Sequence, residues 1–286
     1  MCIRDSNIPE APAKVLGQIN YTVDNGKEPS YYFYVPEEEV EMNPPGTDVH
    51  DVEVQNGWPM VDQFSVDEIG FELHEFTDDF RGFHDDQLVV DGFYPQVIDF
   101  VKEHTGAKRV VVFDHTIRRR MSKEQMEGNV QDEKSVVNRP AVLLVHSDYT
   151  PSSGPQRVRD ILKDEAEELL KGRVAFFNVW KPFCEKVEEL PLAMCDARTS
   201  TDEDFLTMKL KYRERTGEIF VLRHSSKHEW YYFPWMESKH AILLKTYDSE
   251  TDGRARFTGH SAFEDPNSPA SPQQRESIEI RTMAFF

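Results

Sequence analysis

"RPAVLLVHSD", residues 139–148, is an apolar run that leads directly into two residue types that bind metals. Its apolar part, Ala141 to Val145, predicts a buried strand, and His146 and Asp148 follow two positions apart. Alternate residues of a strand point to the same face, so we expect the imidazole and the carboxylate to project together. They can then take two adjacent positions on one metal ion, and a third ligand must come from elsewhere in the chain.

Strand-like segments follow one another from residue 173 to the end of the chain. They are RVAFFNVW, GEIFVLRH, EWYYFPW, HAILLKTY, RARFTGHSAF and RESIEIRTMAFF, and turn residues separate most of them. Helices are expected mainly earlier, at 94–105 with Gly106 as its end, and at 152–172. Many strands in the second half, after helices in the first, predict a β-sandwich or jelly roll with helices packed outside.

The beginning of the chain differs from the rest in composition. Residues 7–65 are rich in Pro, Glu and Asp and contain only short strand-like patches. We therefore expect residues 1–65 to form an N-terminal arm packed on the core, and residues 66–286 to form the jelly-roll domain. The first six residues, MCIRDS, do not continue any sequence pattern of the residues that follow, and we expect them to be a non-native remnant.

Composition and charge exclude several classes of protein. The 286 residues carry a formal net charge of −19, which disfavours nucleic acid as a partner because its phosphates would be repelled. No apolar run approaches the roughly 20 residues that cross a bilayer, and the start lacks the apolar core of a signal peptide. The three cysteines show no metal or disulfide spacing, which fits a reducing compartment. We expect a cytoplasmic protein whose oligomeric state the sequence leaves open.

The third metal ligand is expected among the ten histidines. His260 lies at a strand edge in RARFTGHSAF, and the main alternative is His240, which opens the strand HAILLKTY. His224 and His228 lie between two strands and are expected in a surface loop. Two histidines and one carboxylate on one face of a metal, with three positions open, are typical of non-haem Fe(II) oxygenases.

The last strand carries a second polar pattern. Arg275 and Ser277 are two residues apart, so they share a face. A guanidinium binds a carboxylate through two parallel hydrogen bonds, and a neighbouring hydroxyl adds another, so this pair would hold the far carboxylate of a 2-oxo acid. The polar face of the strand, which predicts a lined pocket instead of a packed interior, consists of Arg275, Ser277, Glu279 and Arg281.

Other polar and aromatic residues are candidates for lining the pocket. Asn178 and Lys181 interrupt an apolar strand, which fits a pocket role and a structural hydrogen bond equally well. Aromatic residues are more often core than contact residues. The candidates for substrate contact are Asn178, Lys181, Arg118 and Tyr231, with Trp180, Trp230 and Tyr232 more typical of the core.

The chain resembles the hydroxylase/desaturase family that includes AsaB-like and gibberellin desaturase-like fungal enzymes and the cephalosporin 7α-methoxylation component. The resemblance covers residues 15–286, through GAKRVVVFDHTIRR, HSDYTPSSGPQRVRD, FFNVWKPF, LPLAMCDART, HEWYYFPWM and RARFTGHSAFEDPNSP with QQRESIEIR. It implies a mainly β, cupin-like double-stranded β-helix that uses Fe(II), 2-oxoglutarate and O2. Carried over by residue, it implies iron ligands at His146, Asp148 and His260 and a 2-oxoglutarate clamp at Arg275 and Ser277.

Two positions depart from the pattern of this family. Arginine is usual where this chain has Lys181, and proline is common where Gly259 precedes the distal histidine. The lysine puts in doubt any contact that needs a guanidinium fork. Neither departure removes a ligand.

The sequence favours an Fe(II)/2-oxoglutarate-dependent oxygenase that hydroxylates or desaturates a small organic molecule, in secondary metabolism. One alternative is a catalytically silent jelly-roll protein that binds a carboxylate, and another is a zinc-dependent hydrolase with the same histidines and acid. A hydrolase does not need a clamp for a second carboxylate, and a protein that only binds a carboxylate does not need a set of three metal ligands. Because the chain has both sets, the oxygenase is preferred, although its substrate is not indicated.

Overall fold

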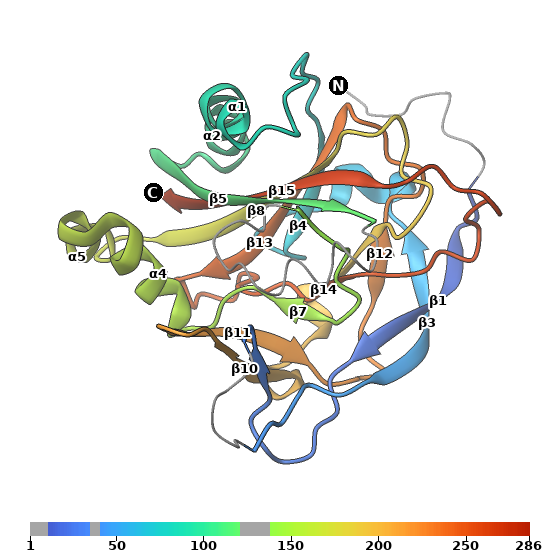
Figure 1. Ribbon diagram of the computed structural model, residues 1–286, viewed down its shortest axis with the longest axis horizontal. Coiled ribbons are helices and arrows are strands. Elements are labelled where there is room, and N and C mark those ends of the chain that lie inside the picture. The colour runs from blue at the N-terminus through green and yellow to red at the C-terminus, as the bar shows by residue number, and fades with distance from the viewer. Residues whose placement is uncertain (1–10, 35–40, 121–137) are drawn as a thin grey trace.

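Two curled β-sheets enclose a common interior in the computed structural model, which describes residues 11–34, 41–120 and 138–286 (Figure 1). Apolar side chains from both sheets meet between them, among them Trp180 and Ile242 from one sheet and Met194 from the other. This is the expected jelly roll. The predicted non-native remnant, residues 1–6, lies outside the described residues.

The larger sheet has nine strands in the order β1-β3-β12-β9-β14-β7-β11-β10-β2. Its first two strands come from the predicted arm, where β1 pairs with β3 in antiparallel fashion, and β3 joins the sheet by a parallel pairing with β12. The division into an arm and a domain stays a prediction. In sheet order, the strands are Lys14–Tyr21, Asp48–Asn56, Trp230–Tyr232, Leu192–Cys195, His260–Ala262, His146–Ser147, Thr216–Leu222, Phe205–Lys211 and Ser30–Tyr32.

The smaller sheet has six strands in the order β4-β13-β8-β15-β5-β6. Side chains alternate along its strands, so that in β13 Ile242 and Leu244 face the interior between the sheets while Ala241 and Leu243 face outwards. In sheet order, the strands are Phe71–Glu75, His240–Asp248, Val174–Pro182, Glu276–Phe285, Arg109–Arg119 and Asn138–Arg139.

Helices cover the outer face of the smaller sheet and one end of the molecule (Figure 1). Helix α2, Tyr94–Thr105, ends at Gly106 with φ +72°, as predicted. Its residues Val97 and Phe100 pack with Ile278 and Ile280 on the outer face of β15. The short α1, Asp86–Leu88, and a π-helical turn, Val89–Phe93, precede it, and α4, Ser153–Leu162, and α5, Ala166–Leu169, lie beside the other end of the sheet.

Two of the predicted elements are wrong in extent. The helix expected at 152–172 breaks at Lys163, whose φ is +44°. The break lets Val158 of α4 and Ala166 of α5 join one apolar cluster with Met283. The strand expected at 141–145 is a single bridge at Leu144, and regular pairing begins only at His146 in β7.

Among the described residues, no helix is long and apolar enough to cross a membrane.

Gly70, at the entrance to β4, fixes the loop that carries His260. Its φ is +94°, and a Cβ there would collide with Thr258 Oγ1. That hydroxyl donates a hydrogen bond to the Gly70 carbonyl at 3.2 Å, and the Thr258 carbonyl in turn lies 3.0 Å from His260 Nδ1. The backbone conformation of Gly70 therefore supports the position of a candidate ligand.

We predict that Gly70→Ala destabilises the protein more than Gly253→Ala. Gly253 has φ +100° with no atom close enough to clash, so alanine there adds only backbone strain, about 1–3 kcal/mol. At Gly70 the collision with Thr258 is expected to add a further 1–3 kcal/mol, roughly. Urea unfolding of both variants measures the difference, and equal free energies of unfolding would contradict the prediction.

Candidate active site

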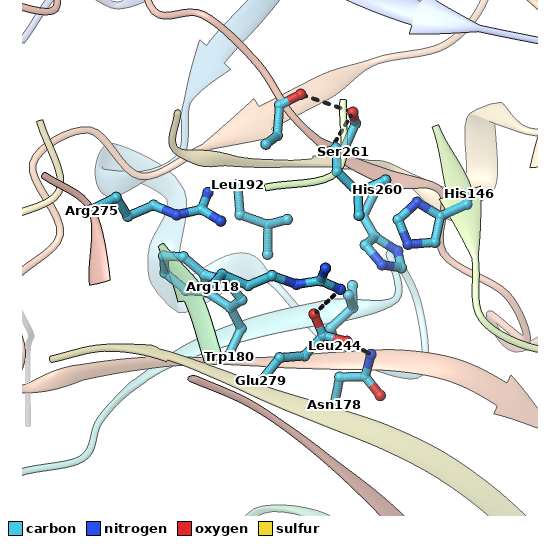
Figure 2. Close-up of a pocket in the computed structure, with 12 residues that line it drawn as sticks. Arg118, His146, Asn178, Trp180, Leu192, Leu244, His260, Ser261, Arg275 and Glu279 are labelled. Atoms are coloured by element: carbon cyan, nitrogen blue, oxygen red, sulfur yellow. Dashed lines mark hydrogen bonds and ion pairs between the residues drawn. The ribbon is translucent and has the colours of Figure 1, made fainter. Parts of the chain in front are cut away.

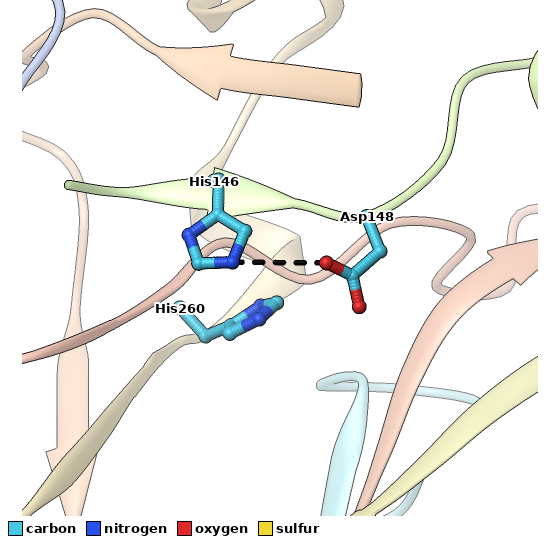
Figure 3. A group of neighbouring side chains, drawn as sticks. All are labelled: His146, Asp148 and His260. Carbon is cyan, nitrogen blue, oxygen red and sulfur yellow. Dashed lines mark ion pairs between the residues drawn. The ribbon is translucent and has the colours of Figure 1, made fainter. Parts of the chain in front are cut away.

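His146 and His260 lie side by side because their strands pair at these two residues. β7 and β14 are antiparallel, and His260 is the register partner of His146. Directly opposite residues of an antiparallel pair point to the same face. The two imidazole centroids are 4.3 Å apart, and Asp148, just after β7, joins them (Figure 3). One ligand atom from each of the three lies within 4.8 Å of the others.

Backbone carbonyls fix the tautomer of both histidines. Nδ1 of His146 lies 2.8 Å from the Leu144 carbonyl oxygen, and Nδ1 of His260 lies 3.0 Å from that of Thr258. A carbonyl can only accept, so Nδ1 carries the proton in each ring and Nε2 presents its lone pair. This is the arrangement that orients histidines as metal ligands.

The charge states of the group also suit a cation. Burial, followed by the neighbouring His260, lowers the pKa of His146 to about 4, so the ring is neutral at pH 7. Burial raises the pKa of Asp148, but Arg281, His260 and His146 together bring it well below its usual range. Two imidazoles that present Nε2 and one carboxylate anion are a donor set that fits Fe(II).

A cavity opens beside these residues and extends between the two sheets to Arg275 (Figure 2). The empty space within the cavity and the open solvent at its mouth together amount to about 410 Å³. Its walls come from both sheets, with the charged groups mainly on the smaller one. The lining residues are Arg118, Val142, His146, Asn178, Trp180, Leu192, Leu244, His260, Ser261, Ala262, Arg275 and Glu279.

Arg275 lies at the end of the cavity away from the histidines, over the ring of Trp180 (Figure 2). Burial and, to a smaller extent, the neighbouring cation Arg118 in the same cavity together lower the pKa of Arg275 to about 10. Its guanidinium donates to the carbonyl of Leu190, a residue with φ +46° that non-glycine residues rarely adopt. The strained backbone thus holds the guanidinium in place.

Ser277 is fully buried two residues further on, and its Oγ has no hydrogen-bond partner among the described residues. A buried hydroxyl without a partner is uncommon, because the unmade hydrogen bond costs free energy. Ser277 is the register partner of Arg118, so these two side chains share the inner face of the sheet. Arg275, Ser277 and Arg118 therefore belong to one face, as the polar pattern of the last strand predicted for the first two.

The structure separates the four candidates for substrate contact. Asn178 and Arg118 line the cavity. Lys181 does not, because it is turned to the other face of β8, where its ammonium donates to the Phe76 carbonyl at 2.7 Å and pairs with Asp78 at 3.1 Å. Tyr231 is not a lining residue; it packs in the apolar cluster that also contains Trp180 and Leu244, and its hydroxyl donates to Glu229 at 3.4 Å.

Glu279 lines the cavity, as the polar face of the last strand predicts, although that pattern assigns it no individual role. Its carboxylate accepts hydrogen bonds from Arg118 at 3.4 Å, from Arg281 at 2.5 Å and from Asn178 at 3.3 Å. Burial raises its pKa, but Arg281 and Arg118 lower it below the usual range.

The remaining histidines lie elsewhere. His240, the alternative third ligand, sits against Trp58 and accepts from the Glu237 backbone N–H at 3.2 Å. It is not part of the three-residue group that could hold a metal. His224 and His228 lie in the loop between β11 and β12, as expected, but a surface position is wrong for His228, whose side chain is completely buried and stacked on Tyr21.

Known proteins share both the sequence and the fold. The family described as an oxidoreductase/YMDC permease-like domain matches residues 19–285. The hydroxylase/desaturase efuI of Hormonema carpetanum is 31% identical over 78% of this chain and 79% of its own length. The Fe(II)/2-oxoglutarate-dependent dioxygenase nvfI of Aspergillus novofumigatus (strain IBT 16806) is 31% identical over 82% and 83%. The chain belongs to the hydroxylase/desaturase family of Fe(II)/2-oxoglutarate-dependent dioxygenases.

A solved structure of this dioxygenase family has the same fold. The iron and alpha-ketoglutarate-dependent endoperoxidase NvfI superposes with a TM-score of 0.84, at 26% identity, over 96% of this chain and 99% of its own. The predicted family, enzyme class and double-stranded β-helix are thus confirmed. The silent carboxylate binder and the zinc hydrolase are not favoured.

Removing Glu279 is expected to destabilise this dioxygenase strongly. Glu279→Ala removes the carboxylate that pairs with the buried guanidinium of Arg118, whereas Arg281 keeps Asp114, and an uncompensated buried charge costs about 3–5 kcal/mol. Glu53→Ala, which breaks an exposed ion pair with Lys14, is the control and is expected to cost less than about 1 kcal/mol. Urea unfolding of the metal-free proteins gives both values, and similar costs would show that the buried network is not needed for the fold.

Proposed function

We propose that this dioxygenase hydroxylates or desaturates a small organic molecule, with His146, Asp148 and His260 as the ligands of Fe(II). One observation carries the assignment: three ligand atoms lie within 4.8 Å of one another, and both histidines present Nε2 to the common space. The donor set and the open side toward the cavity fit a metal that must also bind a cosubstrate.

Arg275 and Ser277 are proposed as the 2-oxoglutarate clamp at the far end of the cavity. The support is the buried Ser277 Oγ, which lacks a partner and can donate to a carboxylate. Arg275 lines the cavity, although Ser277 is not among the lining residues, and the guanidinium is held from behind by the Leu190 carbonyl. A dicarboxylate with one end at the histidines and the other at Arg275 would satisfy both groups.

Bound Fe(II), 2-oxoglutarate and O2 would supply the oxidising chemistry, in which the cosubstrate loses CO2 and a substrate carbon loses hydrogen. The chain supplies position and exclusion of water. Trp180, Leu192 and Leu244 give the cavity apolar walls between its charged ends. The low pKa of His146 keeps its ring neutral and its Nε2 lone pair available, while Arg281 keeps Asp148 ionised.

The small-molecule substrate and a role in secondary metabolism rest on the relatives. One of them, the aspirochlorine biosynthesis protein N of Aspergillus oryzae (strain ATCC 42149 / RIB 40), is 34% identical over 48% of this chain. A cytoplasmic location remains our proposal, supported by two buried cysteines, Cys184 and Cys195, that are free thiols.

An anaerobic titration of metal-free protein with Fe(II) and then 2-oxoglutarate tests the proposed function. The wild type is expected to develop the visible charge-transfer band of an Fe(II)–2-oxoglutarate chelate. His260→Ala should abolish the band, and His240→Ala should keep it, because only His260 faces His146. A wild type that binds no iron, or binds it without the band, would refute the proposal. Loss of the band in His240→Ala alone would refute the choice of ligand.

The clamp is expected to need the fork of Arg275 and not only its charge. Arg275→Lys keeps the charge but loses bidentate binding, so the Kd of 2-oxoglutarate should rise about tenfold or more. Ser277→Ala removes one hydrogen bond, about 0.5–1.5 kcal/mol, and should raise the Kd by a smaller factor. The same titration gives these values, with Arg120→Lys, at a mostly exposed side chain, as the control. An unchanged Kd in Arg275→Lys would rule out the clamp.

A further inference from the structure

The two oxygens of Asp148 have different surroundings. Oδ1 lies 3.7 Å from Nε2 of His146, on the side of the proposed metal. Oδ2 accepts a hydrogen bond of 2.5 Å from Nδ2 of Asn178 and lies 3.6 Å from Nε of Arg281. One oxygen thus faces the histidines, and the other is engaged by the opposite sheet.

We infer that Asn178 and Arg281 are positioning residues that hold Oδ2 of Asp148, so that the carboxylate binds the metal through Oδ1 alone. The inference rests on the proposed function, because it assumes Asp148 to be a ligand. A carboxylate that is held in this way cannot turn to offer both oxygens without losing the bond from Asn178. Single-oxygen binding leaves positions open for the cosubstrate and O2.

The two positioning residues form a pair on the smaller sheet. Asn178 on β8 and Arg281 on β15 are register partners, so their side chains leave the same face next to each other. Asp148 directly follows β7, which is a strand of the larger sheet. The contact therefore crosses the interior between the sheets, and the distance between the sheets decides whether it forms.

Both positioning residues are themselves held before any metal binds. Glu279 accepts from Arg281 at 2.5 Å and from Asn178 at 3.3 Å. Arg281 also donates to Asp114 at 3.0 Å and to Thr116 at 3.1 Å. These bonds lock the rotamers of the two side chains, which is the condition for a preorganised ligand.

The side-chain amide of Asn178 is oriented to donate hydrogen bonds. Its Nδ2 donates to both Asp148 and Glu279, while its Oδ1 is buried without a partner among the described residues. Two carboxylates on one side of the amide require the nitrogen there, because an oxygen would repel both. A role in packing alone would not need an amide at this position.

The test measures Co(II) affinity of metal-free protein by calorimetry, for wild type, Asn178→Ala and Asn178→Leu. Leucine has the same branched skeleton of non-hydrogen atoms as asparagine but cannot donate a hydrogen bond. Loss of a residue that orients a metal ligand typically weakens binding about 10–100-fold, and both variants should show this loss. Asn267→Leu is the matched control, because it removes an amide that donates to Asp265 at 3.2 Å away from the residues that line the cavity, and it should bind Co(II) like the wild type. Circular dichroism and melting of the metal-free proteins check that each variant folds.

Arg281 is tested in parallel with a matched arginine. Arg281→Gln and Arg157→Gln both remove a partner of Asp114, but only Arg281 reaches Asp148. Arg281→Gln should weaken Co(II) binding and alter the visible Co(II) spectrum at saturation, and Arg157→Gln should do neither. If Asn178→Leu fails to fold, this pair still tests whether contacts to Oδ2 of Asp148 affect metal binding.

The outcomes separate the two proposals. A wild type that binds no Co(II) would overturn the proposed function. Wild-type affinity in Asn178→Ala and Asn178→Leu would overturn the inference and leave the proposed metal site intact. Affinity lost with alanine but kept with leucine would also overturn it, since volume alone would then explain the effect. Equal losses in Arg281→Gln and Arg157→Gln would assign the effect to Asp114 and overturn the role of Arg281.

Discussion

The pairing of β7 with β14 is the constraint on which the site depends. Because His146 and His260 are register partners in an antiparallel ladder, the backbone itself brings their rings to a centroid distance of 4.3 Å. A slip of one residue would turn one ring to the opposite face of the sheet and separate the ligands. The loop before β14 protects this register, since Gly70 and Thr258 fit together closely and the Thr258 carbonyl orients His260.

The interior between the sheets is unusual because charges line it. Arg118, Glu279, Arg281 and Asp148 alternate in sign through contacts of 2.5–3.6 Å, so none is left without compensation. Buried ion pairs of this kind are weak evidence for stability, since apolar residues of similar volume are often as stable or more stable. Their presence is therefore better explained by the ligand that they orient and by the anionic cosubstrate that the cavity is proposed to hold.

Much of the site follows from spacing along strands, and the parts that do not follow depend on pairing. His146 with Asp148, and Arg275 with Ser277, are each two apart, so alternation alone predicts their shared faces. The same rule applied to β8 would have separated Asn178 from Lys181, which are three apart and lie on opposite faces. The choice of His260 over His240 depends on which strands are neighbours, and Asn178 meets Asp148 across two sheets. Neither relation has a local signal in the sequence.

The two sheets carry different parts of the proposed site, so their separation affects its geometry. The larger sheet carries the three proposed metal ligands, and the smaller sheet carries the proposed clamp and the residues that hold Asp148. The separation between the proposed metal site and the proposed clamp is therefore set by the side chains packed between the sheets, such as Trp180, Leu192 and Leu244. Close-packed interiors transmit changes of volume to their neighbours. Substitutions in this layer would therefore change how 2-oxoglutarate fits between the two proposed sites, even though the substituted residue binds neither the metal nor the cosubstrate. For this reason the apolar side chains between the sheets matter for the proposed activity as much as the charged residues do.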